Sequence, residues 1–211
     1  MGRPFASRQK GIYMRIHNRL SLFALVLLLA SIVLAPARAE KKSGSEKQKP
    51  ETFSALAVGQ SGGLAGKSVL VTFIVNSYSP EPEVHSLVAT LKKSGPDGLL
   101  KAIDDLDDKG RVAPTHSVGT GVEVIRQVPL KDGKRRITLL TGRNITMAEM
   151  RNLARSQDYP FGLAFLEVDS KGKGTGVMYI GCKIKFNKQE QIEIESYGIA
   201  PLRLMNVYLM D

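Results

Sequence analysis

The sequence predicts one mainly β domain of the α+β class, built on a single antiparallel sheet of eight or nine strands. We expect the sheet to be curled or barrel-like, with a helical hairpin inserted after the second strand. Apolar and polar residues alternate over most of residues 53–211, as they do in strands with one buried face. Turn-forming residues separate these segments. Only residues 82–107 change to the spacing of an amphipathic helix.

Residues 1–39 have the pattern of an export signal. Basic residues lead into an uncharged run of 16 residues, 20–35, which Pro36 closes before an Ala-x-Ala sequence. We therefore expect cleavage between Ala39 and Glu40. The run is shorter than the ~17 to 25 residues of a membrane-spanning helix, so no membrane span is expected after cleavage.

The signal is of the Sec type, because no paired arginines precede the apolar run and no cysteine lies near the cleavage point. The expected location is therefore periplasmic or secreted. Met14 begins a compact version of the same pattern, which leaves Met1 and Met14 as alternative starts.

The charge outside the signal is modest. Residues 1–39 carry six of the 30 basic residues and none of the 20 acidic ones, so the remainder has 24 − 20, or +4. That value gives no support for nucleic acid as a partner. Cys182 is the single cysteine, so the domain has no internal disulfide and is stabilised by packing alone.

The elements follow in order from a flexible leader at residues 40–52, which lacks large apolar side chains. Strands are expected at 53–58 and 68–76, joined by a glycine-rich turn. The helical hairpin begins at the Pro80–Pro82 sequence. Its apolar stripes consist of Val84, Leu87, Val88 and Leu91 in the first helix and Leu99, Leu100, Ile103 and Leu106 in the second.

After Gly110 the strand pattern returns, and the Asp132-Gly133 pair indicates a hairpin. Thr146 and Glu149 form a capping box for a short helix ending near Arg155. The strands expected in this half are 122–128, 137–140, 161–168, 175–186, 191–197 and 202–209.

The strand at 175–186 and the next one form the clearest expected hairpin. Alternation places Met178, Ile180, Cys182, Ile184 and Phe186 on one inward face. Ile192 and Ile194 are expected to face the same way. On the opposite face, Lys183 and Lys185 come opposite Glu193 and Glu195.

Ser61 lies in a Gly-x-Ser-x-Gly sequence that resembles the nucleophile elbow of serine hydrolases. A hydrolase built on Ser61 with His116 is therefore one alternative. However, an elbow requires a helix after the serine, and the next segment here is a strand. The following Gly-Lys-Ser sequence at 66–68 fails as a phosphate loop for the same reason.

No other cluster predicts a metal or cofactor site. Asp104, Asp105, Asp107 and Asp108 form an acidic turn, which leaves weak surface calcium as an alternative, but the spacing does not match a calcium loop. The only histidines after the signal, His85 and His116, lack ligands at metal spacing. We expect His85 to be exposed and Cys182 to be buried and inert. The sequence thus assigns no catalytic, cofactor or metal residue.

The C-terminal third resembles a group of small exported bacterial proteins of unknown function. The sequences that carry the resemblance are Tyr159-Pro160-Phe161-Gly162, Lys183-Ile184-Lys185-Phe186-Asn187 and Ile194-Glu195-Ser196-Tyr197-Gly198-Ile199, with Pro201, Arg203-Leu204 and Asn206-Val207. The likeness extends to residues 53–59 and 113–115. It implies export and one globular domain, and no activity or site residue.

Two non-enzymatic functions are expected ahead of the remote alternative of a serine hydrolase at Ser61. The first is an exported binding module that holds an apolar or amphipathic small ligand inside a curved sheet, with the helical hairpin over its mouth. The second is an envelope-associated protein-interaction module without a ligand cavity. A packed sheet interior would favour the second.

Overall fold

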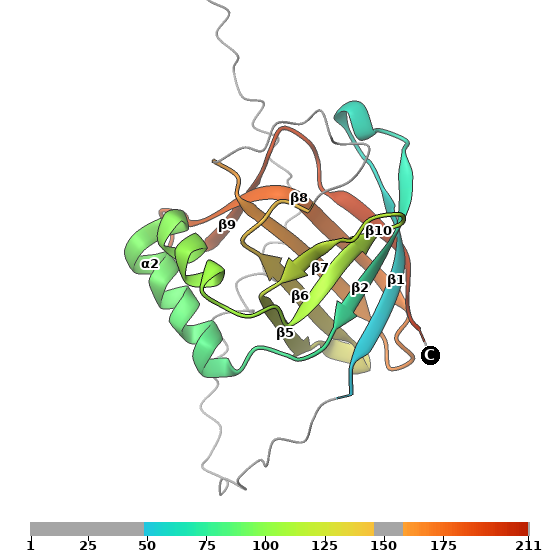
Figure 1. Ribbon diagram of the computed structural model, residues 1–211, viewed down its shortest axis with the longest axis horizontal. Helices are drawn as coiled ribbons and strands as arrows, with labels where there is room; N and C mark the ends of the chain where they lie inside the picture. The colour runs from blue at the N-terminus through green and yellow to red at the C-terminus, as the bar shows by residue number, and fades with distance from the viewer. Residues whose placement is uncertain (1–48, 146–157, 211) are drawn as a thin grey trace, which may run out of the picture.

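Ten antiparallel strands and one helical element make up the computed structural model, which describes residues 49–145 and 158–210 (Figure 1). The strands are β1 (Glu51–Val58), β2 (Ser68–Val75), β3 (Gly110–Pro114), β4 (Thr120–Val122), β5 (Val124–Pro129), β6 (Arg135–Thr141), β7 (Phe161–Val168), β8 (Gly174–Phe186), β9 (Ile192–Ser196) and β10 (Leu202–Leu209). The helix is α2 (Glu81–Asp104), and short 3₁₀ turns are η1 (Gly62–Leu64) and η2 (Lys131–Gly133).

One residue joins the two end strands of the sheet along the chain. Its strand order is β4-β3-β2-β1-β10-β8-β7-β6-β5, and β9 pairs with β8. The chain passes from β4 at one end of this order into β5 at the other through Glu123 alone. The two ends are therefore brought together and the sheet forms a nearly closed barrel. The predicted fold class, a mainly β antiparallel barrel-like sheet with a helical insertion, is confirmed.

The structure has more strands than the eight or nine predicted. The strand expected at residues 122–128 is divided, because β4 pairs with β3 whereas β5 pairs with β6. β3 was not predicted because only one large aliphatic residue, Val112, marks its buried face. Such a short pattern does not stand out from a loop in the sequence.

The predicted leader ends earlier than expected. β1 begins at Glu51, and residues 51–58 pair with β2 over their whole length. Glu51 is ordered because Tyr78 and Arg135 bind its carboxylate. Both are distant in the chain, so the local composition does not reveal these contacts. The signal segment, residues 40–48 and the helix predicted from Thr146 to Arg155 lie outside the described residues.

The predicted helical hairpin is a single element broken in the middle. Gly95 has a φ of 69° and a ψ of −165°, which interrupts the helix directly before Pro96. This left-handed φ suits glycine, and the proline removes a helical hydrogen bond. α2 therefore has two arms, 81–94 and 96–104. Among the described residues, no helix is long and apolar enough to cross a membrane.

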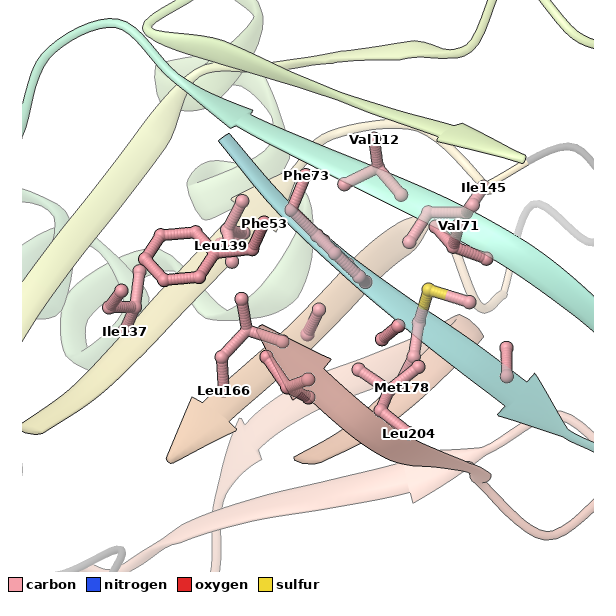
Figure 2. Close-up of a cluster of buried hydrophobic side chains, with 14 of the residues drawn as sticks. Phe53, Val71, Phe73, Val112, Ile137, Leu139, Ile145, Leu166, Met178 and Leu204 are labelled. Atoms are coloured by element: carbon pink, nitrogen blue, oxygen red, sulfur yellow. The ribbon is translucent and has the colours of Figure 1, made fainter. Parts of the chain in front are cut away.

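Apolar side chains from all around the sheet fill the barrel interior (Figure 2). Phe53 and Phe73 contribute from β1 and β2, and Leu139 and Leu166 from β6 and β7; each is no more than 1% exposed. Buried apolar side chains in protein interiors are close-packed. From the sequence we expected a ligand inside the curved sheet, and the described residues place these apolar side chains there.

Polar side chains close one end of the barrel. Arg135 of β6 donates from Nη1 to Glu51 Oε2 of β1 at 3.0 Å, and Tyr78 Oη donates to the same oxygen at 2.6 Å. The Arg135 guanidinium also lies 5.7 Å from the centre of the Phe53 ring. Burial alone would raise the pKa of Glu51, but the hydrogen bonds from Arg135 and Tyr78 outweigh it and lower that pKa.

The glycine-rich loop between β1 and β2 packs against the interior with Leu64, which is buried in the same cluster. A side chain on Gly59 would approach the carbonyl oxygen of Leu64 to 1.9 Å, so this turn requires glycine. The Ser61 Oγ accepts a hydrogen bond from the backbone N–H of Ala200 at 2.7 Å. This contact fastens the loop to the segment before β10.

Candidate functional site

A bulge in β8 turns one half of that strand to the outside of the barrel. Leu163 of β7 pairs with Tyr179, whereas Phe161 pairs with Cys182, so β8 has one extra residue between these pairs. An added residue reverses the alternation of side chains. Met178 and Ile180 therefore point into the barrel, but Cys182 and Ile184 point outwards against α2. The prediction of one shared inward face was wrong for this reason.

The β8–β9 pairing itself is confirmed. Lys183 pairs with Glu195 and Lys185 with Glu193, and Lys185 Nζ lies 3.0 Å from Glu195 Oε2. Tyr159 Oη donates to Glu195 Oε1 at 2.6 Å. The hydrogen bonds from Tyr159 and Lys185 lower the pKa of Glu195. These contacts hold the β8–β9 hairpin together.

The helix α2 packs on the outer surface of the barrel, over β5 to β9. Figure 1 shows α2 on one flank of the barrel, beside β8 and β9, with β1 and β10 on the opposite flank. The apolar stripe of the first arm faces the outer surface of β5 to β9, and Leu99 joins it from the second arm. The helix therefore covers the wall of the barrel instead of its mouth.

An apolar groove of about 110 Å³ remains between α2 and this wall. Its lining residues are Val84, Leu87, Val88, Leu91, Leu99, Val124, Arg126, Thr138, Leu140, Leu163, Phe165, Ile184, Ile192 and Ile194. Several of them, including Leu140 and Ile194, are only half-buried. The groove is smaller than the ~300 to 1,000 Å³ of pockets for drug-sized ligands, but it is open to solvent. A narrow chain fits this shape better than a bulky molecule.

Two polar residues, Arg126 and Thr138, border the groove at its β5–β6 end, although the exposed surface of the groove is apolar throughout. Arg126 and Thr138 are direct cross-strand partners, and both line the groove. The Thr138 Oγ1 is buried and has no hydrogen-bond partner among the described residues. A buried hydroxyl without a partner costs free energy. Because the Oγ1 has no exposed surface, it does not face the groove, and Thr138 borders the groove with its carbon atoms.

The Arg126 guanidinium is bound to a carboxylate in the structure. Glu81, at the start of α2, accepts from Arg126 Nη2 at 3.1 Å through Oε1 and at 3.2 Å through Oε2. The Glu81 side chain is 58% exposed, so this ion pair is close to solvent. His85 Nε2 lies 3.6 Å from Glu81 Oε2 and is a second neighbour for that carboxylate. His85 is exposed, as predicted.

The first arm of α2 is tied to the sheet a second time near its other end. Lys92 Nζ lies 3.0 Å from Glu190 Oε2, in the turn between β8 and β9. Both side chains are exposed, so the pair adds little to stability. The arm is thus held across the groove by an ion pair near each end and by apolar contacts between them.

Ser61 and His116 lie in different loops, the first between β1 and β2 and the second after β3. Ser61 bonds to Ala200 N, and β2 follows its loop in place of a helix. His116 is exposed in a turn after β3, with a φ of 62°. Within the described ranges, neither side chain has a hydrogen bond to a group that would activate the serine. Ser61 has a structural role, because its hydrogen bond holds the β1–β2 loop against the segment before β10.

The remaining candidate residues also lack a reactive arrangement. Cys182 is buried under α2, and burial raises the pKa of its thiol to about 12. A thiol with such a pKa is not a nucleophile at neutral pH. Within residues 49–145 and 158–210, no three His, Cys, Asp or Glu side chains are placed to hold a metal ion, and this includes the acidic turn at Asp104 to Asp108.

One buried acid lies at the strand break. The Glu123 Oε2 accepts from the Gly142 N–H at 3.3 Å, and Oε1 lies 3.9 Å from Arg143 Nε. Burial raises the pKa of Glu123, and the nearby Asp108 adds to the effect. Glu123 does not line the groove. Glu123 lies instead at the junction of β4 and β5, where the two ends of the sheet meet.

Sequence reasoning missed Arg126 and Thr138. The available signal was an arginine within the apolar alternation of Val122, Val124 and Val128. That arginine indicates a polar position on an otherwise apolar face. It does not reveal that Thr138 and Glu81 converge on it, because these contacts depend on the packing of α2.

Comparison with known proteins finds no matching family model, no matching curated protein and no matching solved structure. The resemblance to small exported bacterial proteins therefore stays a prediction. The candidate site consists of the apolar groove between α2 and the outer wall of the barrel.

Proposed function

We propose that this protein is an exported, non-enzymatic binding module that holds the aliphatic chain of a small amphipathic molecule in the groove between α2 and the outer wall of the barrel. The observation that carries this proposal is the groove itself: apolar residues surround unfilled space next to a barrel interior that is fully packed. Each CH₂ group of the ligand that is buried in the groove contributes about 0.8 kcal/mol to the free energy of binding.

The size and openness of the groove support a chain as the ligand. An enclosed apolar cavity of ~150 Å³ holds benzene. The groove is smaller, at about 110 Å³, but it reaches from Val124 on β5 to Ile194 on β9. Four strand spacings of ~4.8 Å correspond to roughly 19 Å of sheet. A narrow chain can therefore lie across the strands while part of it stays in contact with solvent.

The test is calorimetric titration with octan-1-ol. The wild-type protein is expected to bind it saturably at one site. Val88→Trp places a large side chain in the groove from α2 and should weaken binding at least about tenfold, because the added ring fills the space. Leu70→Trp is the matched control, since Leu70 is 54% exposed on β2 and does not line the groove. Equal binding by wild type and Val88→Trp would refute the site.

Export is a separate part of the proposal. It is supported by the basic residues, apolar run and Ala-x-Ala sequence of residues 1–39. N-terminal sequencing of protein isolated from cells should begin at Glu40. Material that begins at Met1 or Met14 would contradict cleavage after Ala39.

A protein-interaction module is the second candidate. The packed barrel interior favours it, and so does a row of apolar residues on the outer surface of the barrel. Leu70, Leu56 and Met205 are neighbours across β2, β1 and β10 on the outer surface, and Leu70 and Met205 are 54% and 41% exposed. The partner would be an envelope protein that packs on this apolar row. Photo-crosslinking in the native envelope separates the candidates. A protein adduct at position 70 with none at position 140 favours this interaction, and a lipid-sized adduct at 140 favours the groove.

A further inference from the structure

We infer that the free edge of β9 receives an extended protein segment as an added antiparallel strand, and that this segment alternates basic and apolar residues. β9 pairs with β8, and among the described residues no strand pairs with its other edge. The inference does not depend on the small ligand, because it concerns backbone groups and glutamates of β9 and not the space under α2.

The hydrogen bonds of the β8–β9 hairpin show which backbone groups of β9 point to this free edge. Tyr197 N donates to Gly181 O at 3.1 Å and continues the ladder beyond the end of β9. Hydrogen-bonded pairs alternate with non-bonded pairs in an antiparallel ladder. Counting back from Tyr197 in steps of two, the N–H and C=O groups of Ile192 and Ile194 point away from β8.

These edge groups are available for pairing. Within the described part of the chain, no hydrogen bond from outside the hairpin reaches the backbone of Ile192 or Ile194. A row of unpaired N–H and C=O groups is a template for another strand. In such strand addition, main-chain hydrogen bonds supply affinity and alternate side chains supply specificity.

The two faces of β9 differ in chemistry, and this difference sets the sequence of the added strand. Ile192 and Ile194 lie on the face towards α2, where they pack against the outer apolar cluster. Glu193 and Glu195 lie on the opposite face. A strand that pairs with β9 is therefore favoured when it places apolar residues opposite the isoleucines and basic residues opposite the glutamates.

Glu193 is the position that most favours a basic partner. Its side chain is exposed, and no described residue forms an ion pair or a hydrogen bond with its carboxylate. Glu195, by contrast, is bound by Lys185 and Tyr159. A basic residue of the added strand opposite Glu193 thus completes an ion pair that the hairpin itself does not make.

The same glutamates disfavour a second copy of this chain as the added strand. When two β9 strands pair antiparallel about Ile194, Glu193 of one copy comes opposite Glu195 of the other. Like charges that lie directly opposite each other are destabilising. The edge therefore selects against itself and in favour of a strand with the opposite charge.

The first test compares two peptides that differ in charge, acetyl-Lys-Val-Lys-Val-Lys-Val-amide and acetyl-Glu-Val-Glu-Val-Glu-Val-amide, titrated into the full chain by calorimetry. The lysine peptide is expected to bind at one site, at least about tenfold more tightly than the glutamate peptide, because several cross-strand charge pairs change sign. Equal affinities, or no binding of the lysine peptide, would overturn the inference.

Backbone methylation separates strand addition from simple charge attraction. In antiparallel addition, the valine N–H groups of the peptide point to Ile192 and Ile194, whereas the lysine N–H groups point away. Methylation of the valine nitrogens should therefore weaken binding at least about tenfold, and methylation of the lysine nitrogens should change it by less than about threefold. Equal binding by the two methylated peptides, or the reverse order, would overturn antiparallel addition at this edge.

Amide hydrogen exchange followed by NMR locates the added strand. The N–H groups of Ile192 and Ile194 should exchange quickly in the free protein and at least about tenfold more slowly with saturating lysine peptide. Those of Glu193 and Glu195 point to β8 and should be protected in both states, so they are the internal control. Unchanged exchange at Ile192 and Ile194 would place the peptide elsewhere and overturn the inference.

A charge reversal tests the role of Glu193. Glu193→Lys should weaken the lysine peptide about three- to tenfold and strengthen the glutamate peptide. Asp107→Lys is the matched control, because it changes the net charge equally at an exposed acid before β3 and should keep the wild-type preference. Equal losses in both variants would show that net charge alone attracts the peptide, which contradicts pairing at β9.

Discussion

The inside and the outside of the same sheet differ in how completely they are packed. Neighbouring residues of β6 show this directly: Leu139 points into the barrel and is 1% exposed, whereas Leu140 points out, lines the groove and is half-buried. Interior packing supplies stability. The outer layer under α2 is less complete, and its unfilled space is available for binding.

The largest expected effect tests this contrast with two leucines. Leu139→Ala should lower the free energy of unfolding by about 2 to 5 kcal/mol, because it leaves a cavity in the packed interior. Leu140→Ala should lower it by roughly 1 kcal/mol, since the side chain borders solvent and existing space. Urea denaturation measures both. Equal losses would show that the two sides of the sheet are packed alike.

The next largest effect on the free energy of unfolding is expected at the end of the barrel where Arg135 binds Glu51. Arg135→Met removes the guanidinium from Glu51 and should cost about 2 kcal/mol at pH 7, less than for a fully buried pair because both groups are partly exposed.

The pH dependence follows from the lowered pKa of Glu51. A lowered pKa stabilises the folded state above the ordinary value of 4.5, and this contribution is lost as pH falls through the folded pKa. The difference between wild type and Arg135→Met should therefore shrink in acid. A constant difference from pH 7 to pH 3 would contradict this role of Glu51.

Glu123 should show the opposite behaviour at the strand break. Because its pKa is raised, its contribution to stability is greatest below 4.5 and declines as pH rises through the folded pKa. Glu123→Gln keeps the shape and should stabilise the protein by about 1 kcal/mol at pH 8. Thermal melts at pH 4 and pH 8 measure it, and a loss of stability at pH 8 would indicate that the ionised carboxylate is needed.

The smallest effect is expected outside the barrel, at the Lys92–Glu190 pair. A double-mutant cycle with Lys92→Ala and Glu190→Ala should give a coupling of about 0.5 kcal/mol or less, because both side chains are exposed. The coupling should also fall at high salt. A value above about 1 kcal/mol would mean that this ion pair, and not the apolar stripe, holds the first arm of α2.

Local sequence patterns determined most of the elements. Alternation located eight of the strand segments, the helical spacing located α2, and Asp132-Gly133 marked the β5–β6 hairpin, where both residues have positive φ. The lysine and glutamate patterns also predicted the β8–β9 register. These features depend on residues that are close in the chain, so the sequence carries them directly.

Only the tertiary structure decided which face each strand presents and where α2 packs. The β8 bulge reverses the side chains after Ile180, and the break at Glu123 transfers the chain between strand partners. Glu81 and Arg126 are 45 residues apart, and Arg135 and Glu51 are 84 apart. Such contacts form because the barrel closes and the helix covers its wall, and a one-dimensional pattern contains neither event.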